Sequence, residues 1–360
     1  MADPALLHPV SREHLAVMSD ATGIMQHAVG SRPDPGHGYC ADDVARALRV
    51  DLAHQRETGW AAVAASADRN LSFLEAAFVP ASGRFRNFRA VGGSWLDDGG
   101  SQDSQGRALH ALGETILLAP DARLVDAASR LLRSALPAAR ELTALRARSS
   151  VLLGCVAAAR GGMDGEVIPT VRLLADRLAA DLRACPDPAW PWPEPILTYE
   201  NGLPAEALIS AGDLLADREM LDAGLRVLDW LVAAQTAPTG HLSPVGNGWW
   251  PRDGIRSRFD QQPIEAAALL LASRAALAAT GDLRHRAAVE QAYGWFLGAN
   301  DGATLVAEPD HGACFDALTP TGVNANQGAE STLVWLLALE GARAVRATPA
   351  PPVRVVAAVA

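Results

Sequence analysis

Long polar loops alternate with short connections along this chain, and this alternation restricts the possible folds more than any other feature. Apolar residues recur at helical spacing in about twelve segments, and no convincing set of strands is seen. The long loops fall on every second connection, at 28–41, 80–103, 186–202, 237–261 and 300–326. In a series of antiparallel helix hairpins, alternate connections lie at the same end, so these loops are expected to converge on one face.

Two architectures place the loops in this way: a closed ring of six helix hairpins, or an open solenoid of hairpins. A solenoid normally carries a sequence repeat, and none is found in these helices, so the ring is favoured. We therefore predict a mostly α, single-domain (α/α)6 toroid over 1–346, followed by a Pro-rich disordered tail or linker over 347–360. Helices are expected at about 12–27, 60–77, 122–137, 139–159, 167–184, 203–215, 221–235, 263–279, 284–298 and 327–345.

The composition narrows the class of partner. The net charge is −10, all basic residues are Arg, and hydrophobic residues make up 49% of the chain. A nucleic acid or an anionic membrane would need a basic surface, so neither is expected as a partner. The N-terminus lacks the pattern of a secretory signal, and no apolar run reaches the roughly 18 residues of a membrane span. A cytoplasmic protein is predicted. Four scattered cysteines are expected to be buried, reduced thiols.

Acidic residues recur where the long loops lead into helices: Asp42, Asp43, Asp103, Glu200, Asp260 and Glu330. Each could simply cap a helix or complement its dipole. Cleavage of a glycosidic bond needs two such groups on one face, one protonated as general acid and one ionised. Asp103 and Asp260 are predicted as the acid/base machinery, with Asp43 and Glu200 as the next candidates.

Aromatic residues in the same loops are candidate platforms for sugar rings, because pyranose faces are apolar and their rims carry hydroxyls. Each loop tryptophan could instead plug the end of the helical barrel. Trp230, Trp295 and Trp335 lie in helical segments and are expected in the core. The candidate platforms are Trp95, Trp192, Trp249, Trp250 and Tyr199.

Other chemistries fit less well. His37, His241 and His311 lie in motif loops, but their spacing matches no metal signature, so no metal or other cofactor is predicted. Paired aspartates could indicate terpene-cyclase chemistry, which requires an apolar, aromatic cavity, whereas these loops are polar. Arg46, Arg86, Arg107 and Arg252 could hold a phosphate or sugar acid, although Arg46 and Arg107 could simply pair with the adjacent aspartates.

Four motifs resemble a group of bacterial and archaeal glycosidase-related proteins, a module often found beside or fused to a glycosyltransferase. They are HGYCADDVARAL at 37–48, QDSQGRAL at 102–109, DQQPIEA at 260–266 and NANQGAESTL at 324–333. The resemblance covers about 11–345 and implies the (α/α)6 toroid of six-hairpin glycosidases. One departure lies in the first motif, where Val44 stands in place of the usual Asn.

The sequence therefore predicts a glycoside hydrolase that cleaves an oligosaccharide, with a glycosyltransferase as a possible partner. The alternatives are a non-catalytic sugar-binding module serving that partner, and a phosphorylase or epimerase on the same scaffold. The predicted substrate-binding residues are His37, Tyr39, Asp42, Arg46, Asn87, Trp95, Asp98, Gln102, Arg107, Trp192, Tyr199, Asn201, Asn247, Trp249, Trp250, Arg252, Gln261, Gln262, Asn326, Gln327 and Glu330.

Overall fold

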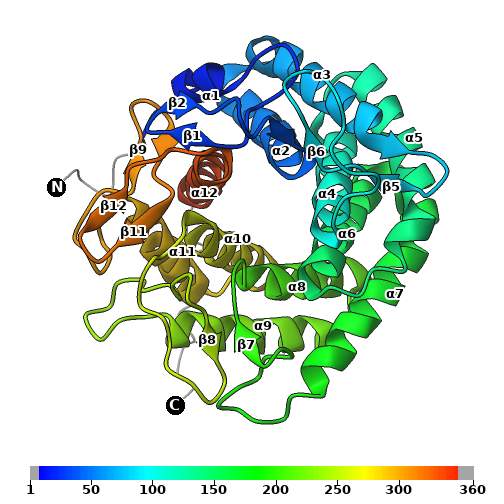
Figure 1. Cartoon of the computed structure of the whole chain (residues 1–360). Coiled ribbons are helices and arrows are strands. Elements are labelled where there is room, and N and C mark those ends of the chain that lie inside the picture. The colour runs from blue at the N-terminus through cyan, green and yellow to red at the C-terminus, as the bar shows by residue number, and fades with distance from the viewer. Residues whose placement is uncertain (1–7, 348–360) are drawn as a thin grey trace.

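The helices form two concentric rings in the computed structural model, which describes residues 8–347 (Figure 1). Each inner helix packs against the next, and the last packs against the first, so that the ring closes. The inner helices are α2 (Ala41–Thr58), α4 (Gln102–Leu118), α6 (Leu145–Ala158), α8 (Gly202–Leu215), α10 (Pro263–Thr280) and α12 (Ala329–Ala347). The outer helices are α1 (Glu13–Met18), α3 (Trp60–Ala77), α5 (Ala122–Ala139), α7 (Asp164–Arg183), α9 (Arg218–Ala234) and α11 (Leu283–Phe296). The predicted mostly α, single-domain (α/α)6 toroid is confirmed.

Short antiparallel strand pairs fold the long loops, and these pairs were missed because each strand has only two or three residues. They are β1 (Ala28–Val29) with β2 (Arg32–Pro33), β3 (Tyr39–Cys40) with β6 (Phe88–Arg89), β4 (Phe78–Val79) with β5 (Arg84–Phe85), β7 (Ile196–Leu197) with β8 (Trp250–Pro251), β9 (Ala307–Glu308) with β10 (Ala313–Cys314), and β11 (Ala317–Thr319) with β12 (Gly322–Asn324). A run this short carries no readable alternation of apolar and polar residues.

Two predicted helix boundaries are wrong for local reasons. The first helix was expected to reach residue 27, but α1 ends at Met18, because the Asp20 carboxylate accepts the backbone N–H groups of Thr22 and Gly23 and folds a turn there. The helix expected from 139 begins at Leu145. In the turn before it, the side-chain oxygen of Gln102 accepts the backbone N–H groups of Thr143 and Ala144. The tail expected over 347–360 lies outside the described residues, except for Ala347, which ends α12.

Helix α10 corrects another expectation. By length and composition it could cross a membrane, and it is the one helix of the described chain that passes this test. It packs between α8 and α12 in the inner ring, which accounts for its apolar character. Its start and end follow local rules: Pro263 occupies the first turn, and Gly281 follows the last in the left-handed conformation, at φ 71°. Among the cysteines, Cys40, Cys155 and Cys314 are buried free thiols, as predicted, whereas Cys185 is half-buried.

Glycines bring α4 and α6 into close contact on the inner ring. A Cβ atom on Gly113 would lie 1.9 Å from the carbonyl oxygen of Gly154, and one on Gly154 would lie 2.3 Å from that of Leu109. Both obstacles are helix backbone, which cannot move aside as the tip of a side chain can. The two helices therefore need glycine at this crossing.

We predict that Gly154→Ala lowers the free energy of unfolding by about 1–3 kcal/mol, because the added methyl group forces the helices apart. The measurement is urea unfolding followed by circular dichroism. The matched control is Gly165→Ala near the start of α7, where an added Cβ meets no atom within 4 Å. That variant should be unchanged or more stable, since alanine favours the helix. Equal losses in both variants would contradict the close-packing explanation.

Candidate active site

The five long loops form a continuous rim at the N-terminal ends of the inner helices, as their alternation predicted. Two strand pairs join different loops, β3 with β6 and β7 with β8. Gln261 forms a β-bridge with Leu318, and the backbone N–H of Gln327 donates to the carbonyl of Gly30 at 2.9 Å. The remaining junction is closed by side chains, because the Tyr199 hydroxyl donates to Asp103 at 2.5 Å. Residues from distant parts of the chain therefore meet around one opening.

Helix capping does not explain the acidic residues at this rim. The N-cap positions of α2, α4 and α10 are Cys40, Ser101 and Gln262, and of these only Ser101 caps its helix with its side chain. On the outer ring, by contrast, Asp121, Asp217 and Asp282 each cap a helix by accepting a backbone N–H. Acidic residues at the rim are thus available for other contacts.

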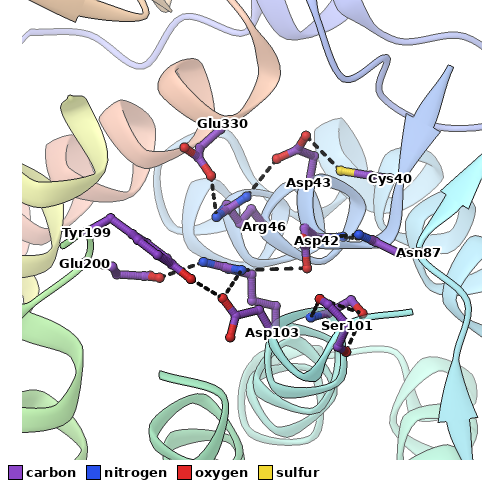
Figure 2. A network of polar contacts seen from close by, with 12 residues as sticks. Cys40, Asp42, Asp43, Arg46, Asn87, Ser101, Asp103, Tyr199, Glu200 and Glu330 are labelled. Atoms are coloured by element: carbon purple, nitrogen blue, oxygen red, sulfur yellow. Dashed lines mark hydrogen bonds and ion pairs between the residues drawn. The ribbon is translucent and has the colours of Figure 1, made fainter. Parts of the chain in front are cut away.

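Two arginines at the centre of the rim hold five carboxylates (Figure 2). Arg46 of α2 donates to Asp43 at 2.8 Å and to Glu330 of α12 at 2.7 Å. Arg107 of α4 donates to Glu200 at 2.7 Å. The other Nη atom of Arg107 lies 3.8 Å from Asp42 and 3.7 Å from Asp103. We call these seven residues the central cluster. Its carboxylates outnumber its guanidinium groups, so it offers no unpaired arginine to an anionic sugar.

Asp43 is the member of the central cluster with the strongest tendency to hold a proton. Burial raises its pKa to about 6, although Arg46 opposes that shift. The Cys40 thiol also donates to this carboxylate at 3.0 Å. Asp43 is 3% exposed, so it has little access to a ligand.

Glu200 has the opposite tendency. Burial alone would raise its pKa, but the charges of Arg107 and Arg46 outweigh that effect and hold the pKa below its usual value. Its backbone has φ 51°, in the left-handed region that side chains rarely adopt. Trp249, on a neighbouring loop, has φ 61°. Strained backbone of this kind often accompanies functional sites.

Asp42 and Asp103 are the carboxylates that approach one another around a single nitrogen of Arg107. Their side chains are 20% and 21% exposed, so both reach the opening of the ring. Asn87 positions Asp42 by accepting the backbone N–H of Asp42 at 3.3 Å, and Tyr199 positions Asp103. One oxygen of Asp42 is buried without a hydrogen bond from the described residues. This pair has the composition of an acid/base site.

Several predicted sugar-binding residues are instead structural, which corrects their assignment. Tyr39 is buried and donates to Asp20 at 2.5 Å. The amide oxygen of Gln102 accepts the backbone N–H groups of Thr143 and Ala144, at 2.7 and 2.8 Å. Trp192 is 2% exposed, so neither of its faces can receive a sugar.

Three more of these residues are buried and form side-chain hydrogen bonds to other segments of the chain. Asn201 is fully buried and accepts from Arg146 at 3.0 Å. Gln261 is also fully buried, and it accepts from Trp295 at 2.9 Å. Gln327 donates to Glu308. The side-chain amides of Asn201 and Gln261 are thus used within the protein, and the Gln327 amide nitrogen is used in the same way.

The remaining aromatic candidates divide between core and surface. Trp250 stacks on Trp230, with ring centroids 6.4 Å apart, and belongs to the barrel end. Trp95 packs edge-on against Phe73 at 5.4 Å. Trp249 is half-buried and lies 6.1 Å from the ring of Tyr199, whose hydroxyl reaches Asp103. Trp249 is therefore the loop tryptophan that adjoins the central cluster.

Asp260 lies outside the central cluster. It is exposed, makes no side-chain contact with the cluster in the described structure, and does not cap α10. Helix α10 stands opposite α4 in the ring, so the segment that carries Asp260 and the start of α4 lie on opposite sides of the ring. The other predicted ligands not yet placed lie on or near the rim surface. These are His37, Asp98, Asn247, Arg252, Gln262 and Asn326. Of these, Arg252 forms an ion pair with Asp187 at 2.6 Å, and the Asn326 side chain accepts the backbone N–H of Gly30.

Sequence analysis missed a second polar layer inside the barrel, beneath the central cluster. Arg49 of α2 pairs with Glu114 of α4 through two bonds of 3.0 and 3.1 Å, and His110 lies 3.3 Å from Glu114. Glu206 of α8 is 6% exposed and has no hydrogen bond to the described residues. Charged residues inside otherwise apolar helical runs, as at Glu206, are the signal that could have revealed this layer.

Arg146 of α6 was also missed. Its guanidinium lies 4.6 Å from the centroid of the Tyr199 ring and donates to Glu194, Thr198 and Asn201 at 3.0, 2.6 and 3.0 Å. It thereby fixes the loop that carries Tyr199 and Glu200.

No protein-family model matches this chain, and no curated protein matches its sequence. Solved structures match it in fold. Cellobiose 2-epimerase from Bacillus thermoamylovorans has a TM-score of 0.74 at 12% identity, over 94% of this chain and 96% of that one. A D-mannose isomerase has a TM-score of 0.68 at 12% identity, over 94% and 96%. The GH76 alpha-mannanase of Bacteroides thetaiotaomicron has 0.64 at 10%, over 92% and 93%. The chain thus has the toroid fold of carbohydrate-processing enzymes.

The second layer yields a pH-dependent prediction. Burial raises the pKa of Glu206 to about 7, against the opposing charges of Arg274 and Arg49. A raised pKa means that the folded state binds the proton more tightly than the unfolded chain, so this contribution to stability is lost as pH rises toward 7 and beyond. Glu206→Gln resembles the protonated form and does not lose this contribution. From pH 5 to pH 8, its free energy of unfolding should therefore rise relative to that of the natural protein by on the order of 2–3 kcal/mol.

Urea unfolding at both pH values measures this gain. Glu219→Gln is the matched control, since Glu219 is exposed on α9 and should change stability by less than about 0.5 kcal/mol at either pH. A constant difference between Glu206→Gln and the natural protein across this pH range would contradict the assignment.

Proposed function

We propose that this protein is a glycoside hydrolase that cleaves an oligosaccharide at the central cluster. The observation that carries the proposal is the placement of Asp42 and Asp103 around one nitrogen of Arg107, at the opening of a toroid shared with carbohydrate-processing enzymes. Glycosidic bond cleavage requires two carboxylates with different protonation states. Asp43 and Glu200 suit supporting roles, because each is held tightly by an arginine.

The contacts of the pair suggest a role for each member. Asp103 accepts a hydrogen bond from Tyr199, which suits an ionised base, and it would take a proton from the attacking water. Asp42 is the proposed acid, because it reaches the opening on the other side of the same Arg107 nitrogen as Asp103. It would give its proton to the glycosidic oxygen as the bond between that oxygen and the anomeric carbon breaks. Water supplies the hydroxyl group that the anomeric carbon gains.

Trp249 is the proposed platform for a sugar ring next to the cleaved bond. It adjoins Tyr199, and its half-buried ring leaves surface for stacking. Arg46 and Arg107 orient the carboxylates, since their guanidinium groups are already paired. A neutral oligosaccharide fits this arrangement better than a sugar acid. Glu330, whose side chain is 43% exposed, would accept hydrogen bonds from sugar hydroxyls.

A second candidate function is sugar epimerisation. It is favoured by two structural neighbours that are epimerases, the cellobiose 2-epimerase and a sugar epimerase from a ruminal bacterium, the latter at 12% identity and a TM-score of 0.71. The two reactions differ in products, because epimerisation releases no shorter sugar. Chromatography of a panel of oligosaccharides after incubation with the protein distinguishes them. Turnover that requires phosphate would instead indicate a phosphorylase.

The cellular setting remains a proposal. A cytoplasmic location is part of this proposal, and the acidic net charge of −10 agrees with it. The motif resemblance supports a glycosyltransferase as partner. Sugar binding without any turnover in the same panel would favour a non-catalytic module that serves such a partner.

We predict that Asp42→Asn and Asp103→Asn each reduce kcat about 10²–10⁴-fold, because each removes a proton-transfer group. The measurement is the release of reducing ends from an oligosaccharide that the natural protein cleaves. Asp126→Asn, on the outer face of α5, is the matched control and should retain full activity. Full activity in a folded Asp103→Asn variant would refute the assignment, and loss in Asp260→Asn alone would move the catalytic role to Asp260.

A further inference from the structure

A second cavity opens at the end of the barrel opposite the rim. It has a volume of about 210 Å³ and is lined by residues from all six inner helices or the turns that follow them. A wider surface depression of about 700 Å³ shares Arg160, Glu206, Ser210 and Arg274 with it, which gives access from solvent. The proposed reaction at the rim uses none of these residues.

Arg274 of α10 has no direct partner in this cavity, although its charge acts on the nearby Glu206. Its side chain is half-buried, and its guanidinium has neither a hydrogen bond nor an ion pair within 4 Å among residues 8–347. The other charges near it are largely balanced. Arg49 is bonded twice to Glu114, and Arg160 pairs with Asp213 at 2.8 Å. A partly buried guanidinium without a partner is suited to a planar or tetrahedral oxyanion, which can accept two parallel N–H bonds.

Glu206 provides a second, independent indication of a ligand. It is more than nine-tenths buried, lines both the cavity and the depression, and has no hydrogen bond within the described chain. Its carboxylate oxygens are not among the fully enclosed atoms, so they face the open space of the cavity, where a bound molecule can supply the missing partner. In its protonated form Glu206 can donate a hydrogen bond to an oxyanion beside Arg274.

The inner helices end toward this side, and a helix C-terminus disfavours an anion. That effect falls off within the last turn. Arg274 lies six residues before the end of α10, and Ser210 lies five before the end of α8. The full charge of Arg274 therefore dominates at the cavity, with the exposed Arg56 of α2 at its edge.

We propose that the cavity opposite the rim is a second ligand site, which binds a small oxyanion, either a carboxylate or a phosphate, on Arg274 and Glu206. The proposal does not depend on the reaction proposed at the rim. Sulfate serves as a probe for the phosphate dianion, because its charge does not change between pH 6 and pH 8, and acetate serves as the probe for a carboxylate.

The experiment is titration calorimetry of the whole protein with sodium sulfate and with sodium acetate, against sodium chloride at equal ionic strength. Saturable binding of sulfate indicates the phosphate class, and that of acetate the carboxylate class. Arg274→Gln should weaken the binding at least tenfold, whereas Arg226→Gln, an exposed arginine on α9, should leave it unchanged. Asp103→Asn should bind as the natural protein does, even if it has lost turnover at the rim.

The pH dependence tests the role of Glu206. The charged groups around it are Arg49, His110 and Glu114 from α2 and α4, Arg160 after α6, Arg274 from α10 and Glu340 from α12. Burial raises the pKa of both Glu206 and Glu340 to about 7, so the cavity becomes more negative above that pH. Sulfate should bind more weakly at pH 8 than at pH 6, and Glu206→Gln should reduce this difference.

Two results would overturn the proposal: no saturable binding of either anion beyond that of chloride, or equal binding by the natural protein and Arg274→Gln. If Arg274→Gln does not fold, the proposal is tested by the sulfate affinity of Glu206→Gln at pH 6 and pH 8. An unchanged loss of affinity between pH 6 and pH 8 in that variant would then count against the site.

Discussion

The pairing of Arg46 and Arg107 with five carboxylates is the interaction on which the rim depends. These carboxylates come from α2, from α4, from α12 and from the loop that precedes α8. Without the two guanidinium groups they would repel one another at the rim. Burial makes the arrangement more demanding, because an unpaired charge in a partly buried place costs several kcal/mol. The central cluster thus ties together helices that lie far apart in sequence, and it creates carboxylates with unequal proton affinity.

Close backbone contact below the rim allows these charges to meet. Gly113 and Gly154 let α4 and α6 approach until backbone touches backbone. Arg107 is carried by α4, and Arg146 on α6 holds the loop that brings Glu200 to Arg107. A wider crossing would displace Arg146 together with that loop. The close packing of α4 against α6 therefore also sets the positions of Arg107 and Arg146 at the site.

Much of this organisation could be predicted from sequence, because it depends on local patterns. Helical periodicity and the alternation of loops predict the ring, and motifs at helix starts indicate Asp43, Asp103 and Glu200, which the structure brings together. Individual polar roles could not be predicted. Gln102, Gln261 and Asn201 have the chemistry of sugar ligands, but their side chains bond to residues 41, 40 and 55 positions away. Spacing within one motif holds no information about such partners.

Charged residues inside the barrel couple the rim electrostatically to the cavity at the opposite end. Arg46 and Arg49 lie one turn apart on α2, with the first in the central cluster and the second in the layer beneath it. A small cavity of about 20 Å³, with room for about one water molecule, is bordered by Arg46, Glu200 and Glu206. The negative charge of Glu200 helps to raise the pKa of Glu206. Neutralising Glu200 at the rim would therefore ease the ionisation of Glu206 at the far cavity, and by reciprocity a charge change at Glu206 acts on the proton affinity of the rim.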